Sequence, residues 1–415
     1  MIAVQPKQSA LLTRANRLCL GLLFALGACG GEGGSGDDRV VTDSAGIEII
    51  TLRMTGDDAG MHEARLLLDL GLTEGAEEFV LAGVAGAVQL SDGRIVVANG
   101  VTSELRFYSE TGEFLQRVGH AGEGPGEFRD IAFLDVLPGD TIIVYDARLR
   151  RTSLFGPDPT FIVSHLLADA SLPYVGGTMG AGDFGAMQFV SEEEEGLGVY
   201  TAPTEVGRIN VQGGAFEVFD TIPSGEEARV QYQGRVTRAF RPFGFESDVA
   251  AAGEQLYVLS SAEDGAIRVY AADGTLQRIM RIEIPQRPAD AAAVEAWVES
   301  WIASFPAGSP QIEVWWRHGF RETPAPASVP SFRSLVADED GNVCAERYPL
   351  TWTGAATYLC FSPDGHFLRS IRLAEGLVRL GPHAFFDPAL EIGADYALGV
   401  WQDSLDVQHV RMYGF

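Results

Sequence analysis

Three side chains with oxygen donors, Asn99, Asp146 and Glu346, each stand at the end of a short apolar run. The runs read "RIVVAN", "TIIVYD" and "VCAE". Carboxylate and amide oxygens are the ligands that Ca²⁺ takes, and a bound divalent ion can activate water for hydrolysis. If the fold brings the three residues to one opening, they could therefore hold a metal ion.

The competing interpretation is that these polar residues simply end strands and pair with one another. It is favoured because the equivalent run "QLYVLS" carries Ser260 where a metal ring would need an acidic residue. No histidine recurs in the pattern either, so the sequence does not select a catalytic base. The histidines are His62, His120, His165, His318, His366, His383 and His409.

A glycine-rich stretch, "RVGHAGEGPGEF" at residues 117–128, raises the question of a phosphate-binding loop. A phosphate loop should open a helix, whose first N–H groups bind the anion. No helical pattern follows Phe128, and Glu123 and Glu127 would repel phosphate. The stretch is therefore predicted to connect two strands, with glycines that permit positive φ.

The charge and the motifs exclude several function classes. The chain carries a net charge of −27, and Lys7 is its only lysine, which disfavours nucleic acid as a partner. The sequence contains no H-E-x-x-H, no G-x-S-x-G and no P-loop G-K-[ST], so the familiar zinc protease, serine hydrolase and nucleotidase sites are not indicated.

The elements that must position these residues form repeats. Segments starting at Asp92, Gly139, Gly253 and Gly341 share three β-rich runs separated by turns, and an apolar run precedes each. Four strands in about 40–50 residues is the period of a β-propeller. A weaker unit, with a hairpin at Gly213-Gly214, fits between the second and third segments.

The last predicted unit combines the two ends of the chain. The C-terminal "DYALGVWQDSLDVQHVRMYGF" supplies about three strands, and "EARLLLDLG" (63–71) supplies an outer one. Pairing them would close a ring and remove sheet edges. The prediction is an all-β fold, a six-bladed propeller of four-stranded antiparallel blades over residues 41–415.

The segments "DGRIVVAN", "ELRFYSETGEFLQRVG" and "GEGPGEF" resemble NHL-type repeats and the related six-bladed propeller lipoproteins of bacteria. The resemblance covers most of residues 84–373. It implies a rigid scaffold that binds partners through its loops. Among six-bladed enzymes of similar architecture, lactonases and gluconolactonases hold Ca²⁺ at the channel mouth, which is the implied precedent for a metal site here.

Alternating strand direction places the loops on two faces. The tight turns at Asp92-Gly93, Asp273-Gly274 and Asp364-Gly365 share one face, and the longer loops share the other. Function in a propeller most often uses such loops on a rigid scaffold. The candidates on the long-loop face are Asn99, His120, Arg129, Asp130, Asp146, Arg148, Arg150, Arg151, Glu346, Arg347 and Trp352.

Two insertions interrupt the repeats. "ADAAAVEAWVESWIASF", within 288–306, puts Val294, Trp297, Trp301 and Phe305 on one stripe of a helix with Asp290 as its N-cap. The helix is expected to pack on its own propeller, with a lid or docking surface as the alternative. The acidic run 192–195 is expected to be a solvated loop.

The first residues predict export and lipid anchoring. Positive residues precede an apolar stretch too short to span a bilayer, which indicates a signal peptide over 1–28. "LGAC" resembles the bacterial lipobox, so Cys29 is predicted to carry lipid, with a flexible tether over 29–40. Removal of 1–28 would change the net charge from −27 to −30. Because Gly30 follows Cys29, the outer membrane is favoured.

Cys344 and Cys360 remain in the mature chain besides Cys29. They lie in successive predicted strands, and antiparallel pairing about a centre near Trp352 sets them opposite each other. In an oxidising compartment this predicts a cross-strand disulfide. Their separation of sixteen residues excludes a C-x-x-C metal site.

The leading functional expectation is a monomeric, lipid-anchored propeller in the cell envelope that binds a protein or small ligand without catalysis. The alternative is a divalent-metal-dependent hydrolase or lactonase with its site at the channel mouth. A third option, a structural envelope component, would show exposed aromatic patches near Trp315, Trp316 or Trp352.

Overall fold

The computed structural model describes residues 38–56, 60–72, 75–167, 174–180, 182–190, 196–260, 263–304, 310–379 and 390–415. The predicted signal peptide, the lipidation site Cys29 and most of the tether lie outside these residues. The first strand begins at Asp38, two residues before the predicted end of the tether. Among the described residues, no helix is both long and apolar enough to cross a membrane.

The first two sheets are each four-stranded and antiparallel. They consist of Val84–Gln89 (β5), Ile95–Asn99 (β6), Glu104–Tyr108 (β7) and Phe114–Val118 (β8), followed by Ile131–Leu137 (β9), Thr141–Asp146 (β10), Arg151–Phe155 (β11) and Phe161–Leu166 (β12). Strands β6 and β7 are buried along their whole length, whereas β8 is half-buried to exposed. The inner strands are therefore covered on both faces, as in a stack of sheets.

The next two sheets repeat this order and are joined through their innermost strands. They consist of Tyr174–Met179 (β13), Asp183–Phe189 (β14), Pro203–Ile209 (β16) and Phe216–Pro223 (β17), and of Asp248–Ala252 (β20), Gln255–Leu259 (β21), Ala266–Ala271 (β22) and Leu276–Glu283 (β23). Gly177 of β13 bridges Ala251 of β20. A Cβ at Gly177 would lie 2.3 Å from the Ala251 carbonyl oxygen, so only glycine permits this approach.

The last two sheets complete six four-stranded units. They consist of Phe332–Ala337 (β26), Val343–Arg347 (β27), Ala356–Phe361 (β28) and Phe367–Leu373 (β29), and of Glu391–Ile392 (β30), Tyr396–Gln402 (β31), Gln408–Gly414 (β32) and Arg65–Leu70 (β4). Strand β4 pairs antiparallel with β32, with Leu70 opposite Val410. This confirms the predicted pairing of residues 63–71 with the C-terminal strands. The fold is a β-propeller of six blades.

Six apolar clusters each lie between two blades. Val96 and Phe107 of the first blade pack with Ile142 and Phe155 of the second. Equivalent clusters join each following pair of blades. One of them joins the last blade, which contains β30, β31, β32 and β4, to the first blade. Because each blade buries both faces in this way, the innermost strands are held rigidly around the propeller's centre.

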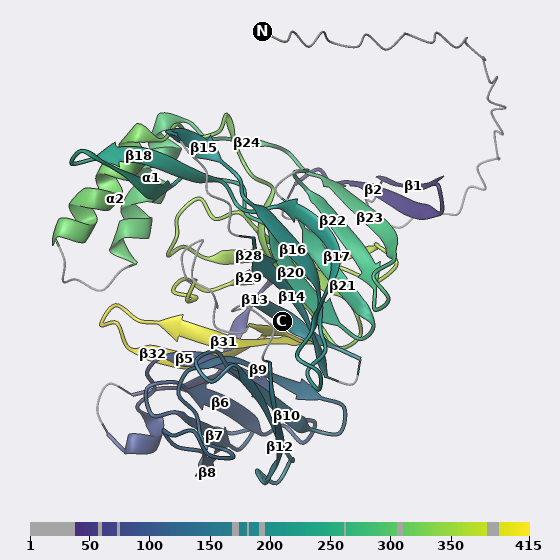
Figure 1. Ribbon diagram of the computed structural model, residues 1–415, viewed down its shortest axis with the longest axis vertical. Helices are drawn as coiled ribbons and strands as arrows, with labels where there is room; N and C mark the ends of the chain where they lie inside the picture. Colours follow the sequence, from purple (N-terminus) through teal and green to yellow (C-terminus); the bar gives the residue numbers. More distant parts are fainter. Residues whose placement is uncertain are drawn as a thin grey trace, which may run out of the picture. The chain divides into compact units, whose positions relative to one another are not determined.

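Segments near the N-terminus cover the edges of two blades. Asp38–Ser44 (β1) and Ile47–Arg53 (β2) form a hairpin whose second strand runs parallel to β23, and Figure 1 shows the pair beside that blade. Met61–Glu63 (β3) runs parallel to β29. These added strands were not predicted. They pair with the outer strands of two blades, whose edge backbone groups would otherwise be unpaired.

A helical insertion and a small sheet pack together beside the propeller (Figure 1). The helices are Ala291–Ala303 (α1) and Pro310–Glu322 (α2), flanked by the short pair Arg287–Pro288 (β24) and Ser328–Val329 (β25). The sheet consists of Gly198–Tyr200 (β15), Glu227–Tyr232 (β18) and Arg235–Phe240 (β19). Helix α2 contacts both β18 and β19. Neither α2 nor this sheet was predicted.

Helix α1 confirms its predicted start and stripe. The Asp290 side chain accepts a hydrogen bond of 2.9 Å from the Ala293 N–H, and Trp297 and Trp301 are buried. They pack among aromatic side chains that include Phe243, Phe320 and Trp352. Trp352 is only 2% exposed, which corrects the expectation that it could belong to an exposed aromatic patch. Phe305 and the acidic run 192–195 lie outside the described residues.

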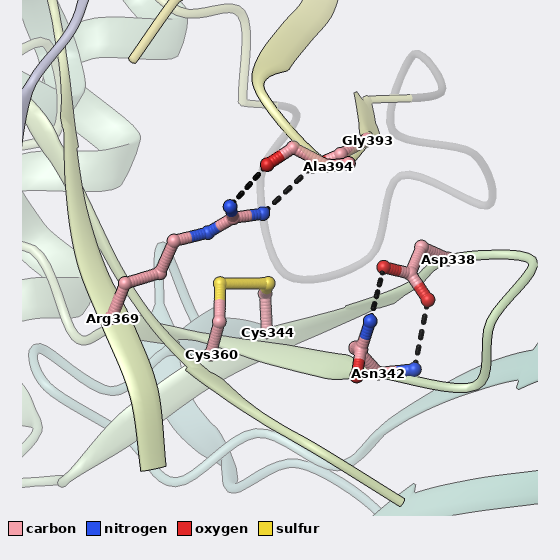
Figure 2. Close-up of a disulfide and its surroundings, with 7 residues drawn as sticks. All are labelled: Asp338, Asn342, Cys344, Cys360, Arg369, Gly393 and Ala394. Atoms are coloured by element: carbon pink, nitrogen blue, oxygen red, sulfur yellow. Dashed lines mark hydrogen bonds between the residues drawn. A yellow bond between two sulfur atoms is a disulfide. The ribbon is translucent and has the colours of Figure 1, made fainter.

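The predicted disulfide is present. Cys344 of β27 lies opposite Cys360 of β28, and their sulfurs are bonded (Figure 2). Both residues are buried against the final blade, in the cluster that contains Trp401. Nearby, Arg369 donates hydrogen bonds to the Gly393 and Ala394 carbonyls, which ties the fifth blade to the sixth beside the disulfide (Figure 2).

Candidate functional site

Asn99 and Asp146 stabilise the backbone where their strands end. The Asn99 Oδ1 accepts a hydrogen bond of 2.9 Å from the Ala82 N–H. The Asp146 Oδ2 accepts from the N–H groups of Arg129 and Asp130, and its Oδ1 accepts from Leu149. Each side chain therefore fastens its own turn to the segment that enters the blade, as expected for polar residues that end strands.

The glycine-rich stretch 117–128 connects β8 to β9, as predicted. Its Glu127 folds back onto the loop and accepts a hydrogen bond of 2.7 Å from the Gly124 N–H. Arg151 reaches into the loop and donates to the carbonyls of Glu123, Gly124 and Glu127. The loop is thus held by its own carboxylate and by an arginine of the neighbouring blade, and it is followed by a strand.

The remaining candidates around this connector are exposed. The His120 Nε2 lies 3.0 Å from a Glu127 carboxylate oxygen, and the Arg129 guanidinium donates to Glu123 over 3.2 Å. Asp130 and Arg148 are also exposed. The structure brings Arg129 and Asp130 to Asp146 through backbone N–H groups, so these residues form a local turn network.

Glu346 belongs to a different set, a buried cluster of charges. Its Oε1 accepts a hydrogen bond of 2.7 Å from the Arg379 Nε, and its Oε2 accepts from Arg333 and Ser334. Burial alone would raise the pKa of Glu346, but the two guanidinium groups outweigh it and hold this pKa below its usual range. Glu346 is therefore an anion between two cations.

Arg347 and Trp352 surround this cluster. Arg347 donates to the Ser331 carbonyl, and the Arg333 guanidinium lies 4.9 Å from the centre of a Trp352 ring. The Trp352 indole N–H donates to the Arg379 carbonyl over 3.2 Å. Among the predicted candidates, Glu346, Arg347 and Trp352 thus come together, with Arg333 and Arg379 as partners that the sequence interpretation missed.

The cluster forms part of the wall of a cavity of about 160 Å³ at the centre of the propeller. The innermost strands of all six blades contribute to its lining. Its charged lining residues are Asp135, Asp248, Arg333, Glu346, Arg379 and Glu391. Tyr174 and Tyr358 add aromatic surface with hydroxyl groups. A mixed lining of this kind is typical of small-molecule sites.

A second, larger cavity of about 670 Å³ adjoins the first, since both are lined by Val88, Asp135, Ala251, Ala337 and Glu391. Its lining also includes the acidic residues Asp140, Asp338, Glu339, Asp340 and Asp395. The tight turn at Gly93 lies here, so this is the short-turn end of the channel. The two cavities give the centre an arginine-bearing end and an acidic end.

Burial raises the pKa of two carboxyl groups that line both cavities, Asp135 and Glu391. It raises the pKa of Asp135, against the hydrogen bond that Thr178 donates. It also raises the pKa of Glu391 to about 7, although Tyr396 and the Gln89 N–H both donate to this carboxyl group. Glu391 therefore carries less negative charge near neutral pH than its formal charge implies.

The candidate metal ligands do not share one set of contacts. Asn99 and Asp146 bind backbone N–H groups in separate turns, while Glu346 binds two arginines. The described residues contain no group of three or more His, Cys, Asp or Glu arranged to hold a metal ion. Ser260, at the equivalent position in the fourth blade, is buried.

Three of the charged residues that line the cavity could have been recognised from the sequence. The innermost strands are apolar runs interrupted by single charged residues, namely Asp135 in "DIAFLDVL", Asp248 in "SDVAAA" and Arg333 in "SFRSLVAD". A lone charge in such a strand indicates a position that faces the channel, because a charge between blades would be buried without solvent. Arg379 lies beyond the recognised repeat and had no such signal.

The protein is thus a six-bladed β-propeller with a charged cavity between its innermost strands. Residues 74–155 match a family model described as a 6-bladed beta-propeller. No curated protein matches the chain's sequence.

Solved structures to which the chain is similar include a putative exported protein from Bacteroides fragilis (12% identity, TM-score 0.44, 88% of this chain and 99% of that one). A virginiamycin B lyase from Staphylococcus aureus has 8% identity and a TM-score of 0.37, covering 84% and 98%. A gluconolactonase from Xanthomonas campestris has 11% identity and a TM-score of 0.37, covering 85% and 97%. These identities assign no ligand or reaction to the chain.

Proposed function

We propose that the protein is an extracytoplasmic, lipid-anchored binding module that takes a small ligand in its central cavity without catalysis. The observation that carries the proposal is the buried set Arg333, Glu346 and Arg379 in the wall of a cavity shared by all six blades. Burying charges costs solvation, and here they border a space of molecular size instead of packed apolar side chains.

The metal-dependent alternative receives less support from the geometry. A shared ion would need Asp146 to release three backbone N–H groups and Glu346 to release two guanidinium groups. The metal would have to offset the loss of those charge-assisted hydrogen bonds. A titration with Ca²⁺ followed by EDTA tests this alternative: a rise in the thermal unfolding midpoint that EDTA reverses would support it.

The proposed location rests on the N-terminal sequence. The signal-like residues 1–28, the lipobox-like cysteine Cys29 and the Gly/Ser/Asp stretch after it favour a tethered protein in the cell envelope. A net charge of −27 with a single lysine disfavours nucleic acid as a partner. Mass spectrometry of the mature N-terminus would show a diacylglyceryl modification on Cys29 if this proposal is correct.

The binding function is tested by thermal unfolding of the full-length protein against small organic anions, cations and neutral polyols. A ligand that binds the native state stabilises it by RT ln(1 + L/Kd), where L is the free ligand concentration, so the midpoint rises with that concentration even after the site is saturated. At least one class should raise it, and the shift should vanish in Ala132→Phe, which enlarges a cavity-lining side chain. The matched control Ala292→Phe adds the same bulk at an exposed position.

A panel that leaves the midpoint unchanged for the wild-type protein would contradict a small-molecule function. A shift that Ala132→Phe retains in full would instead place the ligand outside the cavity.

A further inference from the structure

We propose that the two adjoining cavities bind a linear organic polyamine. One ammonium group lies beside Asp135 and Glu391, which line both cavities, and the others lie at the rim of the larger cavity. The rim is formed by the exposed residues Glu339, Asp340 and Asp395. This inference rests on the proposed function, because it names the ligand class of the same site.

The linings of the two cavities carry far more negative than positive groups. Nine carboxyl groups line them, against the two guanidinium groups of Arg333 and Arg379. Both arginines are already paired with Glu346. The larger cavity has seven of the carboxyl groups, and among the described residues no arginine, lysine or histidine lines it. A cleft lined by charges of one sign concentrates ligands of the opposite sign, so this cavity favours a cation.

Asp135 and Glu391 mark the place where the two cavities meet. Both are half-buried, so they keep surface that a ligand can contact. Their side-chain partners are neutral: Thr178 donates to Asp135 over 2.8 Å, and Tyr396 and the Gln89 N–H donate to Glu391. Burial raises the pKa of both carboxyl groups. An ammonium group beside them would stabilise their ionised forms and form charge-assisted hydrogen bonds.

Further carboxyl groups lead from Glu391 to the rim. Glu339 and Asp340 lie in the turn between β26 and β27, and Asp395 lies between β30 and β31. After burial, the charges of Asp135 and Glu339 also contribute to the raised pKa of Glu391, so these groups interact electrostatically. The carboxyl groups thus form a series from the junction of the cavities to solvent, which suits a ligand with several positive charges along one chain.

Arg369 is a cation that approaches the edge of this lining. It attracts Asp338 and Asp395, but it does not line the cavity, and its hydrogen bonds go to two backbone carbonyls beside the disulfide (Figure 2). Asp338 accepts from the N–H and the side-chain amide of Asn342. One guanidinium group at this edge does not balance seven carboxyl groups.

The arginine-bearing end of the first cavity is covered by the helical insertion. The Arg333 guanidinium lies 4.9 Å from the centre of a Trp352 ring, and Trp352 packs edge-on against Trp297 of α1. Arg333 and Trp352 are only 5% and 2% exposed. The acidic rim is thus the exposed side of the cavities, and its charge attracts a cation that approaches from solvent.

The spread of the carboxyl groups favours an extended organic cation over a metal ion. Within the described part of the chain, no three His, Cys, Asp or Glu side chains are arranged to hold a metal. One water needs roughly 10–15 Å³ of such volume, so 670 Å³ holds on the order of fifty waters, which is room for a flexible chain. Leu90, Leu137 and Ile392 also line this cavity and would contact the methylene groups between the ammonium groups.

The test is isothermal titration of the full-length protein with spermidine and with two pairs of equal chain length. The pairs are 1,4-diaminobutane with 1,4-butanediol and 1,6-diaminohexane with 1,6-hexanediol, and each diol keeps the chain and removes the charge. We expect at least one diamine to bind about 10- to 100-fold more tightly than its diol, as charge-assisted hydrogen bonds imply. The affinity should fall as the NaCl concentration rises from about 50 to 300 mM, because salt screens the exposed rim. Lactate, Ca²⁺ and trilysine are titrated in parallel.

Two variants locate the bound amine. Asp135→Asn keeps an acceptor for Thr178 and removes one charge, so it should reduce the affinity for the tightest-binding amine about 10-fold. The rim variant, Glu339→Gln with Asp340→Asn, should reduce the affinity for spermidine by a similar factor. Its effect on the shorter 1,4-diaminobutane should be smaller, because that chain extends less far from Asp135 and Glu391.

The matched control is Glu113→Gln with Asp158→Asn. It removes the same two kinds of charge from exposed turns of the first two blades, outside both linings. It should bind every compound within about 2-fold of the wild type, because distant exposed charges are screened. Circular dichroism and urea unfolding establish that Asp135→Asn is folded. If it unfolds, the rim variant decides the question, since both of its altered side chains are exposed.

The outcomes separate the two proposals. Diols or lactate that bind as tightly as the amines, or amine affinities that both Asp135→Asn and the rim variant retain, would overturn the polyamine assignment and leave the binding function intact. Tighter binding of Ca²⁺ or trilysine than of every amine would also overturn it, in favour of a metal ion or a basic protein segment. If no compound of either panel binds the wild-type protein, both proposals fail.

Discussion

Glu346 and Arg379 form a buried ion pair: their side chains are each 1% exposed, and the Nε of Arg379 lies 2.7 Å from the Glu346 Oε1. The pair joins the end of β27 to the segment that follows the same blade's outermost strand. Because Arg333 approaches the other carboxylate oxygen, Glu346 holds two guanidinium groups at the wall of the cavity.

Replacing Glu346 should destabilise the protein strongly. Glu346→Gln leaves the buried Arg379 guanidinium without its counter-ion and leaves Arg333 with only Glu246, 3.7 Å from its Nε, and such a change costs about 3–5 kcal/mol. Urea unfolding followed by tryptophan fluorescence measures it. Glu263→Gln serves as the control, because the Arg281–Glu263 pair is about 40% exposed and should contribute under ~1 kcal/mol. Equal losses in the two variants would show that burial of the Glu346 pair is unimportant.

The disulfide should contribute to stability by restricting the unfolded chain. Cys344 and Cys360 close a loop with a sequence separation of 16, for which about 3 kcal/mol is expected. The double variant Cys344→Ala with Cys360→Ala should lose about this amount in urea unfolding. Reduction should expose two further thiols in the unfolded wild-type protein. An unchanged thiol count on reduction would mean that the bond is absent in the purified protein.

Glu391 should make stability depend on pH. Burial raises its pKa from 4.5 to about 7 in the folded protein, so folding favours the protonated form. Its stabilising contribution is therefore present below about pH 4.5 and is lost as the pH rises through 7. Glu391→Gln stays neutral, so its unfolding free energy relative to the wild type should rise by up to ~3 kcal/mol between pH 4.5 and 8.

The control for that experiment is Glu375→Gln, since Glu375 is exposed. Its unfolding free energy should follow the wild-type curve at every pH. A constant difference between Glu391→Gln and the wild type across this range would show that Glu391 titrates normally.

The N-cap of α1 offers a sharper test of the insertion. The Asp290 carboxylate accepts the Ala293 N–H, so Asp290→Ala should weaken the helix by about 1 kcal/mol. Asp290→Asn keeps a capping oxygen and should change little. Hydrogen exchange of the α1 amides reports this local stability. Equal protection in both variants would indicate that tertiary packing of Trp297 and Trp301 alone holds the helix.

The sequence predicted the blades because their signals are local. Period-two runs, turns such as Asp92-Gly93 and a repeated order of strands are all read from neighbouring residues, and the Cys344–Cys360 pairing followed from the centre of one hairpin. Helix α2 and the strands β1, β2, β18 and β19 were missed. They lie outside the repeat. Although β1–β2 and β18–β19 are local hairpins, β2 pairs with β23, and α2 contacts β18 and β19, far along the chain.

The site was predicted only in part for the same reason. Glu346 was found because it ends a repeated strand, but Asn99 and Asp146 at equivalent positions bind backbone groups instead. What distinguishes Glu346 is its contact with Arg333 and Arg379, which are 13 and 33 residues away in sequence. No local pattern encodes that contact.

The proposed binding function is tested most directly by a crystal structure of the full-length protein with the compound that raises the thermal unfolding midpoint most. We expect that compound in the cavity between the six innermost strands. A compound bound elsewhere on the protein would contradict the proposed function.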